Sequence, residues 1–425
     1  MGAYKSRPSS SCSEAWLKRM RESYITLRTR IAQDTSVGKG IELSALQQAC
    51  CDDDIDAILE LISDKNIHER TDTGYTLLHL CCMDGGCKSA VRFFARMGAS
   101  VNSLSMRGFT ALHVATYVGD IELVSDLLMG GADVNQVGYA SIVPLHLACL
   151  AGHAQIAELL LRYDADLHIR DALMSTPLHC ACFFGHDQVV KCLINHNADV
   201  NMAGGVETRP LHLACAKGFL TVTELLMTGR KNNKADVIAH DSEKNTPLHY
   251  CARNGHMDVL NALLDAPGNV KGQEVNIYGD TPLHVACYHG KLDVTEELVA
   301  RMDVDCLFSE NIFSETPLHC ACTSGKNQDL VQFLLEQPGT NIDYQGWDGH
   351  TALHSACYHG HLHLVELLLE HGASLDLTCN DDVMASHIKM QTCITWANEK
   401  GHEDVMNLLK KVSLERKTST RQGGN

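Results

Sequence analysis

The chain has 425 residues, 19 cysteines and a formal net charge of −17, and only 5% of its residues are aromatic. Because no run of 18 apolar residues occurs and the N-terminus has no apolar signal core, we expect an intracellular protein without a transmembrane segment. Residues 1–40 carry a charge of +5, residues 410–425 carry +4, and those between them carry about −26. Such an acidic body disfavours nucleic acid and attracts basic proteins, although the same charge would also keep a long array soluble.

The N-terminus contains a lipidation pattern. Residues 1–6 fit the pattern for N-myristoylation of Gly2, and Lys5 and Arg7 would add the electrostatic signal that a single acyl chain needs for weak membrane association. The alternative is an unmodified, disordered terminus.

A helix is predicted over residues 12–33, because Leu17, Met20, Tyr24, Leu27 and Ile31 follow one another at spacings of three and four. Basic residues flank this apolar stripe. Two heptads of this kind could form a short coiled coil. The alternative is a helix that folds against the first unit of the repeat array that follows.

A short motif around a histidine recurs along the chain, as in Thr281-Pro282-Leu283-His284. The nine motif histidines lie 33 to 37 residues apart and are His79, His113, His146, His179, His212, His249, His284, His319 and His354. A period near 33 with this motif is typical of ankyrin repeats, each built from a β-turn finger and two antiparallel helices. We therefore predict an all-α repeat solenoid, an ankyrin array of about nine full repeats with degenerate caps.

The motif also explains where each first helix begins. Threonine is a good N-cap because its hydroxyl accepts from amides of the first turn, and proline at the next position loses nothing by lacking an N–H. A glycine stands six residues after each motif histidine, as at Gly290, and suits the left-handed turn that ends a helix.

Seven of the nine repeats place a cysteine three residues after the histidine, as at Cys182 and Cys322. We interpret these cysteines as small buried apolar residues in a reducing compartment. A zinc site is the alternative at His179-Cys180-Ala181-Cys182 and His319-Cys320-Ala321-Cys322. Repeats packed about 8 to 10 Å apart disfavour it, because zinc needs ligands at roughly 2.0 to 2.3 Å.

Degenerate units stand at both ends of the array. Gln47 takes the histidine position in residues 41–62, and Thr395 takes it in the last unit. We expect a basic N-terminal segment with a short coiled-coil-like helix (1–40), an ankyrin-repeat domain (41–411) and a basic disordered tail (412–425).

Partner-binding residues are predicted from apolar side chains at positions that folding leaves exposed, the finger tips and the open side of the first helices. The finger positions, six or seven residues before the motif histidine, hold Tyr139, Leu173, Ile277, Tyr278, Ile312, Phe313 and Trp347. Four residues after the histidine stand Tyr117, Phe183, Tyr288 and Tyr358. The alternative is that the finger aromatics pack on neighbouring fingers.

Catalytic motifs are missing from the sequence. It contains no phosphate loop, nucleophile elbow, H-E-x-x-H motif or protein-kinase motif set. We therefore expect a protein-interaction scaffold that is not an enzyme and binds no metal or cofactor.

Longer stretches resemble a particular family. Residues 1–8, 275–284, 310–316, 348–361 and 391–402 resemble the N-terminal half of the troponin I-interacting ankyrin-repeat kinases, and the resemblance covers residues 1–411. In that family a short coiled-coil segment precedes the array, and a tyrosine-kinase-like protein kinase domain and a serine-rich tail follow it.

The resemblance implies an array that recruits partners, cardiac troponin I among them, and regulates a kinase in cytoplasm and nucleus. After Lys411 the chain continues only to Asn425, so no kinase residue can be carried over. Two interpretations stay open. The chain is a scaffold, or it is the regulatory N-terminal half of a serine/threonine kinase whose ATP- and Mg-dependent domain is not in these residues.

Overall fold

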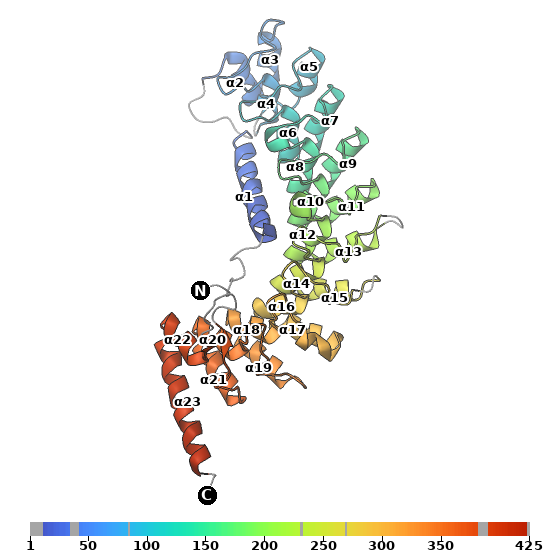
Figure 1. Cartoon of the computed structure of the whole chain (residues 1–425). Coiled ribbons are helices and arrows are strands. Elements are labelled where there is room, and N and C mark those ends of the chain that lie inside the picture. Colours follow the sequence, from blue (N-terminus) through green and yellow to red (C-terminus); the bar gives the residue numbers. More distant parts are fainter. Residues whose placement is uncertain are drawn as a thin grey trace. The chain divides into compact units, whose positions relative to one another are not determined.

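Helix pairs follow one another along the chain and are joined by fingers of turn residues (Figure 1). The computed structural model describes residues 12–34, 42–83, 86–229, 233–267, 270–380 and 390–422. They fall into two compact units: an N-terminal unit of residues 12–214 and 221–236, and a C-terminal unit that contains residues 215–220 and those from 237 onwards. The predicted all-α repeat architecture is confirmed. Gly2 lies outside the described residues.

Each full repeat consists of an inner and an outer helix. The inner helices are α4 (Leu77–Cys82), α6 (Ala111–Val118), α8 (Pro144–Ala151), α10 (Pro177–Phe184), α12 (Pro210–Lys217), α14 (Pro247–Asn254), α16 (Pro282–Tyr288), α18 (Pro317–Ser324) and α20 (Ala352–His359). The outer helices are α5 (Ala90–Arg96), α7 (Ile121–Met129), α9 (Ala154–Arg162), α11 (Asp187–Asn195), α13 (Leu220–Thr228), α15 (Met257–Leu264), α17 (Leu292–Arg301), α19 (Gln328–Glu336) and α21 (Leu362–Glu370). The described residues also include the short 3-10 helices η1 (Tyr139–Ser141), η2 (Gly205–Glu207) and η3 (Val304–Phe308).

The motif histidine caps its own helix and ties consecutive repeats together. At His113 the backbone amide of Thr110 donates to Nδ1 at 3.3 Å, so Nδ1 carries no proton, and Nε2–H donates to the carbonyl of Ile142 in the next finger at 3.1 Å. The Thr110 hydroxyl accepts from the His113 amide at 3.3 Å, as the N-cap prediction requires. The ring is therefore held neutral, and its burial lowers the pKa of His113 to about 4.

The core runs between inner and outer helices and includes the motif cysteines. The residues Cys82, Cys149, Cys182, Cys215, Cys287, Cys322 and Cys357 are all buried and form no disulfide. This burial supports their interpretation as small apolar residues. At the inner-helix ends, Gly119 and Gly152 have φ of 91° and 85°, which confirms the predicted left-handed turn.

Degenerate helix pairs flank the full repeats, as predicted. The first pair is α2 (Ala45–Cys51) and α3 (Ile55–Leu61), and the last is α22 (Cys393–Lys400) and α23 (Glu403–Gln422). A short antiparallel pair, β1 (Cys379–Asn380) with β2 (Met390–Gln391), precedes α22. Gln47 reproduces the histidine cap, because the Ser44 amide donates to its Oε1 at 3.1 Å.

The prediction of a disordered tail is wrong for residues 412–422, because α23 continues through them. No glycine or proline interrupts this stretch before Gly423. Arg416 also fixes the helix to α21 and the residues after it by donating to the carbonyls of Ala373 and Leu369 at 2.9 and 3.3 Å.

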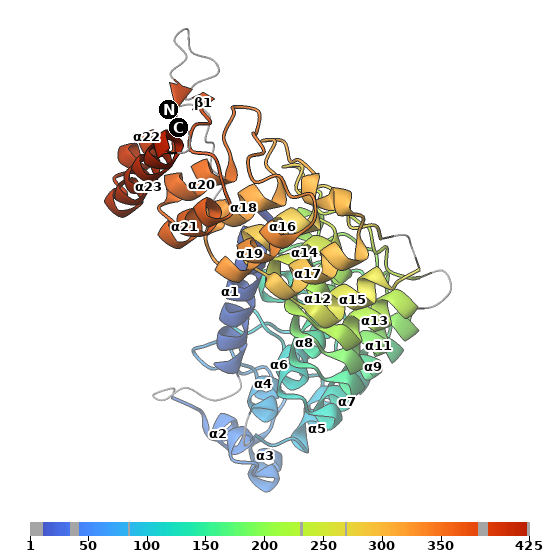
Figure 2. The same ribbon diagram turned by 90° about the horizontal axis from the view of Figure 1, so that it is seen from below.

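The N-terminal helix α1 (Cys12–Ala32) lies alongside the fingers and inner helices of the N-terminal unit (Figures 1 and 2). Its buried apolar residues are Trp16, Met20, Tyr24, Leu27 and Ile31, with Trp16 in place of the predicted Leu17. Of the two expectations for this stretch, packing within the chain is observed. The helix contacts several repeats instead of the first alone, and the stripe considered for a coiled coil faces the array.

Candidate protein-binding site

The finger tips form a regular row, because the backbone amides of several tips donate to the finger before them. The amide of Tyr139 donates to the Gly108 carbonyl at 2.8 Å, and the amide of Ile312 donates to the Tyr278 carbonyl at 2.9 Å. Residues seven before each motif histidine therefore recur at one position of the array. A partner could contact several of them at once.

In the C-terminal unit this row is apolar and open to solvent. The exposed fractions of Ile277, Ile312 and Trp347 are 43%, 62% and 51%. The neighbouring Tyr278 and Phe313 are half-buried. Large apolar side chains at this exposure are the pattern expected of a docking surface.

The predicted inner-helix residues are less accessible than the finger tips. Tyr117, Tyr288 and Tyr358 are half-buried. The Lys400 ammonium lies 4.2 Å from the centre of the Tyr358 ring, and the Trp396 ring lies 5.3 Å from it. These tyrosines are only partly exposed, so the open apolar surface consists mainly of the finger tips.

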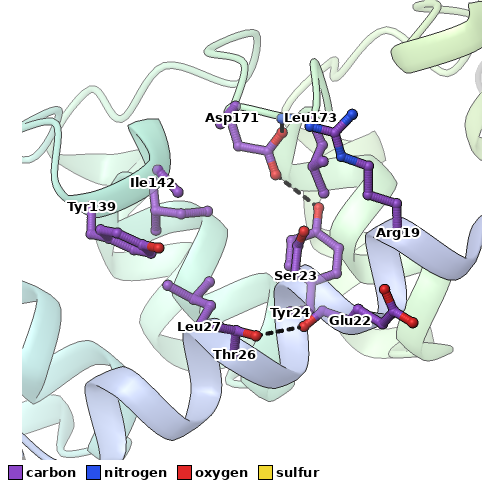
Figure 3. A pocket seen from close by; sticks show the side chains of 12 residues that line it. Arg19, Glu22, Ser23, Tyr24, Thr26, Leu27, Tyr139, Ile142, Asp171 and Leu173 are labelled. Carbon is purple, nitrogen blue, oxygen red and sulfur yellow. Dashed lines mark hydrogen bonds between the residues drawn. The ribbon is translucent and has the colours of Figure 1, made fainter. Parts of the chain in front are cut away.

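In the N-terminal unit, α1 covers part of the same finger and inner-helix positions, whereas Met106, seven residues before His113, is 75% exposed. The Arg30 guanidinium lies 4.0 Å from the centre of the Tyr139 ring, and the Tyr24 ring lies 6.0 Å from that of Phe183. A cleft of about 270 Å³ remains between α1 and the fingers, with Tyr139 and Leu173 in its wall (Figure 3). The residues Tyr139, Leu173 and Phe183 were predicted to bind a partner. In the structure they contact α1, a helix of the same chain, or line the cleft beside it.

A buried phenol anchors the middle of α1. The Tyr24 hydroxyl donates to Asp171 Oδ2 at 2.9 Å and lies 3.1 Å from the Cys180 sulfur, and Figure 3 shows it pointing between the fingers. Burial, followed by the neighbouring Cys180 and Asp171, raises the pKa of Tyr24 well above its ordinary value. The phenol therefore stays protonated and remains a hydrogen-bond donor.

A second anchor lies just after the C-terminal end of α1. Asp34 has no exposed surface and accepts hydrogen bonds from Tyr75 at 2.7 Å and Ser105 at 2.8 Å. Arg107 lies 2.8 Å from the same carboxylate and neutralises its charge. The carboxylate is thus held by the first two fingers.

Two further residues, Arg28 and Trp16, fit α1 closely to the inner surface. Arg28 donates to the Leu150 carbonyl at 2.7 Å and stacks 4.4 Å from the centre of the Phe184 ring. At the other end the finger residue is Gly205, and a Cβ there would collide with the Trp16 indole nitrogen. Sequence reasoning found this surface and the amphipathic helix separately, but it did not connect them.

Metal ligation at His179, one of the two predicted zinc alternatives, conflicts with the hydrogen bonds of its ring. His179 uses Nδ1 to accept from the Thr176 amide at 3.2 Å and Nε2 to donate to the Thr208 carbonyl at 3.0 Å, so it has no free lone pair for zinc. Elsewhere in the described ranges, Glu158, Cys192 and His196 offer ligand atoms within 4.8 Å of one another. Burial raises the pKa of Cys192 to about 12, and Arg162 pairs with the same glutamate, so we assign no metal there.

None of the helices in the described part of the chain is long and apolar enough to cross a membrane.

Comparison with known proteins agrees with this geometry. The family model described as ankyrin repeats in three copies matches residues 46–138, 141–204, 202–277, 269–345, 301–381 and 326–421. The chain therefore belongs to the ankyrin-repeat family.

The individual relatives reported below all carry one name. The serine/threonine-protein kinase TNNI3K of mouse is 47% identical over 411 residues, which are 96% of this chain and 48% of the relative. The rat protein of the same name is 54% identical over 411 residues, with the same two shares. The human protein is 48% identical over 131 residues, 31% of this chain and 15% of the relative. The chain spans about half the length of the mouse and rat relatives, and the resemblance inferred from its motifs is confirmed.

Proposed function

We propose that the chain is a protein-interaction scaffold that captures partner proteins through the finger tips and inner-helix face of its ankyrin repeats. The observation that carries the proposal is the open apolar row of Ile277, Ile312 and Trp347 in the C-terminal unit. Burying one such side chain in an interface contributes about 1.5 to 3 kcal/mol, and tryptophan is the residue most often found at binding hot spots.

The charge of the array points to basic partners. About −26 lies on the residues between 41 and 409, and this field would attract a basic protein and speed its association. Cardiac troponin I, which the family resemblance implies as a partner, is basic and is the first candidate to test. For the site of action we propose cytoplasm and nucleus, as in that family.

The test measures capture of recombinant cardiac troponin I by the immobilised 425-residue chain. Ile312→Ala and Trp347→Ala should each weaken binding by about tenfold or more, since 1.4 kcal/mol is a factor of ten. Leu414→Ala is the matched control, because its side chain is 65% exposed and belongs to the helix α23 instead of a finger.

Melting temperature should be unchanged in all three variants, because each removes an exposed side chain. Capture that is equally strong in the finger variants and the control would refute this site.

A second function rests on the relatives. The mouse and rat proteins are named as serine/threonine-protein kinases and are about twice as long as the match. We propose that, joined to such a kinase domain, this array would bring partners to it. The 425-residue chain alone should then show no ATP binding in a titration with Mg-ATP, and measurable binding would contradict the scaffold assignment.

A further inference from the structure

The N-terminal unit already contains a complete example of what its inner surface can bind. Helix α1 presents Trp16, Met20, Tyr24, Leu27 and Ile31 on one face, and all five are buried. Ile25 on the opposite face is 55% exposed. An amphipathic helix with apolar anchors at three- and four-residue spacing is a recurring mode of groove recognition.

The surface under α1, formed by the fingers and inner helices of the N-terminal unit, is called the groove below. A comparison of two repeats shows that this groove has a position that accepts the Tyr24 side chain. In the His249 repeat, Tyr250 follows the motif histidine, and its hydroxyl donates to Asp241 of the same repeat at 2.8 Å. In the His179 repeat the equivalent residues are Cys180 and Asp171. The small cysteine leaves room for a phenol, and Tyr24 of α1 supplies it at 2.9 Å from Asp171. In the His179 repeat the phenol that binds the aspartate therefore comes from α1, whereas in the His249 repeat it comes from the repeat itself.

The finger row folds without such a cover elsewhere in the array. In the C-terminal unit, considered by itself, Ile277 and Ile312 occupy the same finger position and are open to solvent. Their backbone amides still pair with the preceding fingers at 2.9 Å. A covering helix is therefore no requirement of the repeat fold, which distinguishes α1 from the helices that build the repeats.

The charges of the array and of α1 favour an amphipathic helix with basic residues as the ligand of the groove. Residues 12–34 contain five basic and three acidic residues, whereas the array is strongly acidic. Two of those arginines, Arg28 and Arg30, donate to array carbonyls at 2.7 and 3.1 Å. The groove thus combines apolar contact with acceptors for basic side chains.

We propose that α1 is a resident, displaceable ligand of this groove, and that the groove selects amphipathic helices with a basic flank and a tyrosine at the Asp171 position. The inference deepens the proposed scaffold function by naming the class of partner and the regulation of one of its surfaces. A partner helix reaches the N-terminal groove only when α1 leaves it.

Physical considerations make the exchange feasible. Most helical stability in proteins comes from the packing of an amphipathic face, so α1 depends on the groove for much of its stability. Its attachment to the chain gives it an effective concentration of the order of millimolar, which a dilute competitor cannot match. A change that weakens docking in cis therefore opens the groove to a helix supplied in trans.

The experiment adds a fluorescein-labelled peptide of residues 13–34 to the full chain and measures fluorescence anisotropy. Met20→Asp in the chain places a charge on a fully buried face of α1, whereas Ile25→Asp places the same charge on its solvent face. We expect Met20→Asp to bind the peptide at least about tenfold more tightly than the wild type or Ile25→Asp, because only the first loses its tethered competitor.

A second peptide with Tyr24→Phe should bind the Met20→Asp chain more weakly than the unchanged peptide. Circular dichroism confirms that the repeats of each variant remain folded. Equal binding to all three chains, or no binding to Met20→Asp at peptide concentrations near the effective millimolar range, would overturn the proposal.

The peptide assay needs no partner protein. Failure to capture troponin I would therefore count against the scaffold function without affecting this result, and the reverse also holds.

Discussion

The motif histidines should make the array sensitive to mild acid. His113 accepts a hydrogen bond at Nδ1 and donates one from Nε2, and burial lowers its pKa from 6.5 to about 4. The unfolded chain takes up a proton below pH 6.5, but the folded chain does not until the pH approaches 4. Stability is therefore complete above about pH 6.5 and is lost as the pH falls toward the folded pKa.

The magnitude follows from the two pKa values. A difference of about 2.5 pH units corresponds to about 3 kcal/mol in full, of which about 2 kcal/mol should be lost between pH 7 and pH 5. His179 and His249 also have pKa values of about 4, so the wild-type chain loses several such contributions.

The variant His113→Gln isolates one contribution. Glutamine occupies this position naturally at Gln47, where it keeps the cap hydrogen bond and cannot titrate. In urea unfolding followed by circular dichroism, the loss of stability from about pH 7 to about pH 5 should shrink by about 2 kcal/mol. The control His168→Gln changes an exposed side chain and should leave that loss unaltered. An undiminished loss in His113→Gln would refute the reasoning.

Three further predictions concern the docking of α1, the reactivity of the cysteines and the absence of a structural metal. Tyr24→Phe removes the hydroxyl that donates to buried Asp171 and should weaken α1 docking by about 1 to 3 kcal/mol. This weakening should be seen as faster hydrogen exchange of the α1 amides. Its match, Tyr250→Phe, breaks the same bond inside a repeat and should lower the melting temperature while α1 exchange stays unchanged; equal acceleration in both variants would contradict the docking role. Iodoacetamide should modify exposed Cys12 first and buried Cys322, whose thiol pKa burial raises, only after unfolding. Added EDTA should leave the unfolding midpoint where it was, and a lowered midpoint would reinstate a structural metal.

Local patterns were sufficient to predict the repeats. The Thr-Pro-Leu-His motif contains its own helix start, because the cap, the proline and the histidine interact within four residues. Even the degenerate unit at Gln47 was recognisable, since its cap uses the same short-range geometry. The finger tips could be located for the same reason: their distance from the histidine is constant along the chain.

Prediction failed where local signals allowed two outcomes. Residues 412–422 are basic and polar, which favoured a disordered tail, but Arg416 reaches carbonyls of the preceding repeat and extends α23. Spacings of three and four in residues 12–33 suit a coiled coil and a docked helix equally, because both bury one face.

The sequence by itself determined the period, the start and end of the inner helices and the positions of the exposed apolar finger tips. All of these depend on contacts between residues close together in the chain. Only the tertiary structure decided which finger tips are available, because Tyr24 meets Asp171 across 147 residues and no spacing rule specifies that pairing. The long-range packing of α1, with the Tyr24 phenol beside Cys180, distinguishes the surface that α1 covers in the N-terminal unit from the open row at Ile312 and Trp347 in the C-terminal unit.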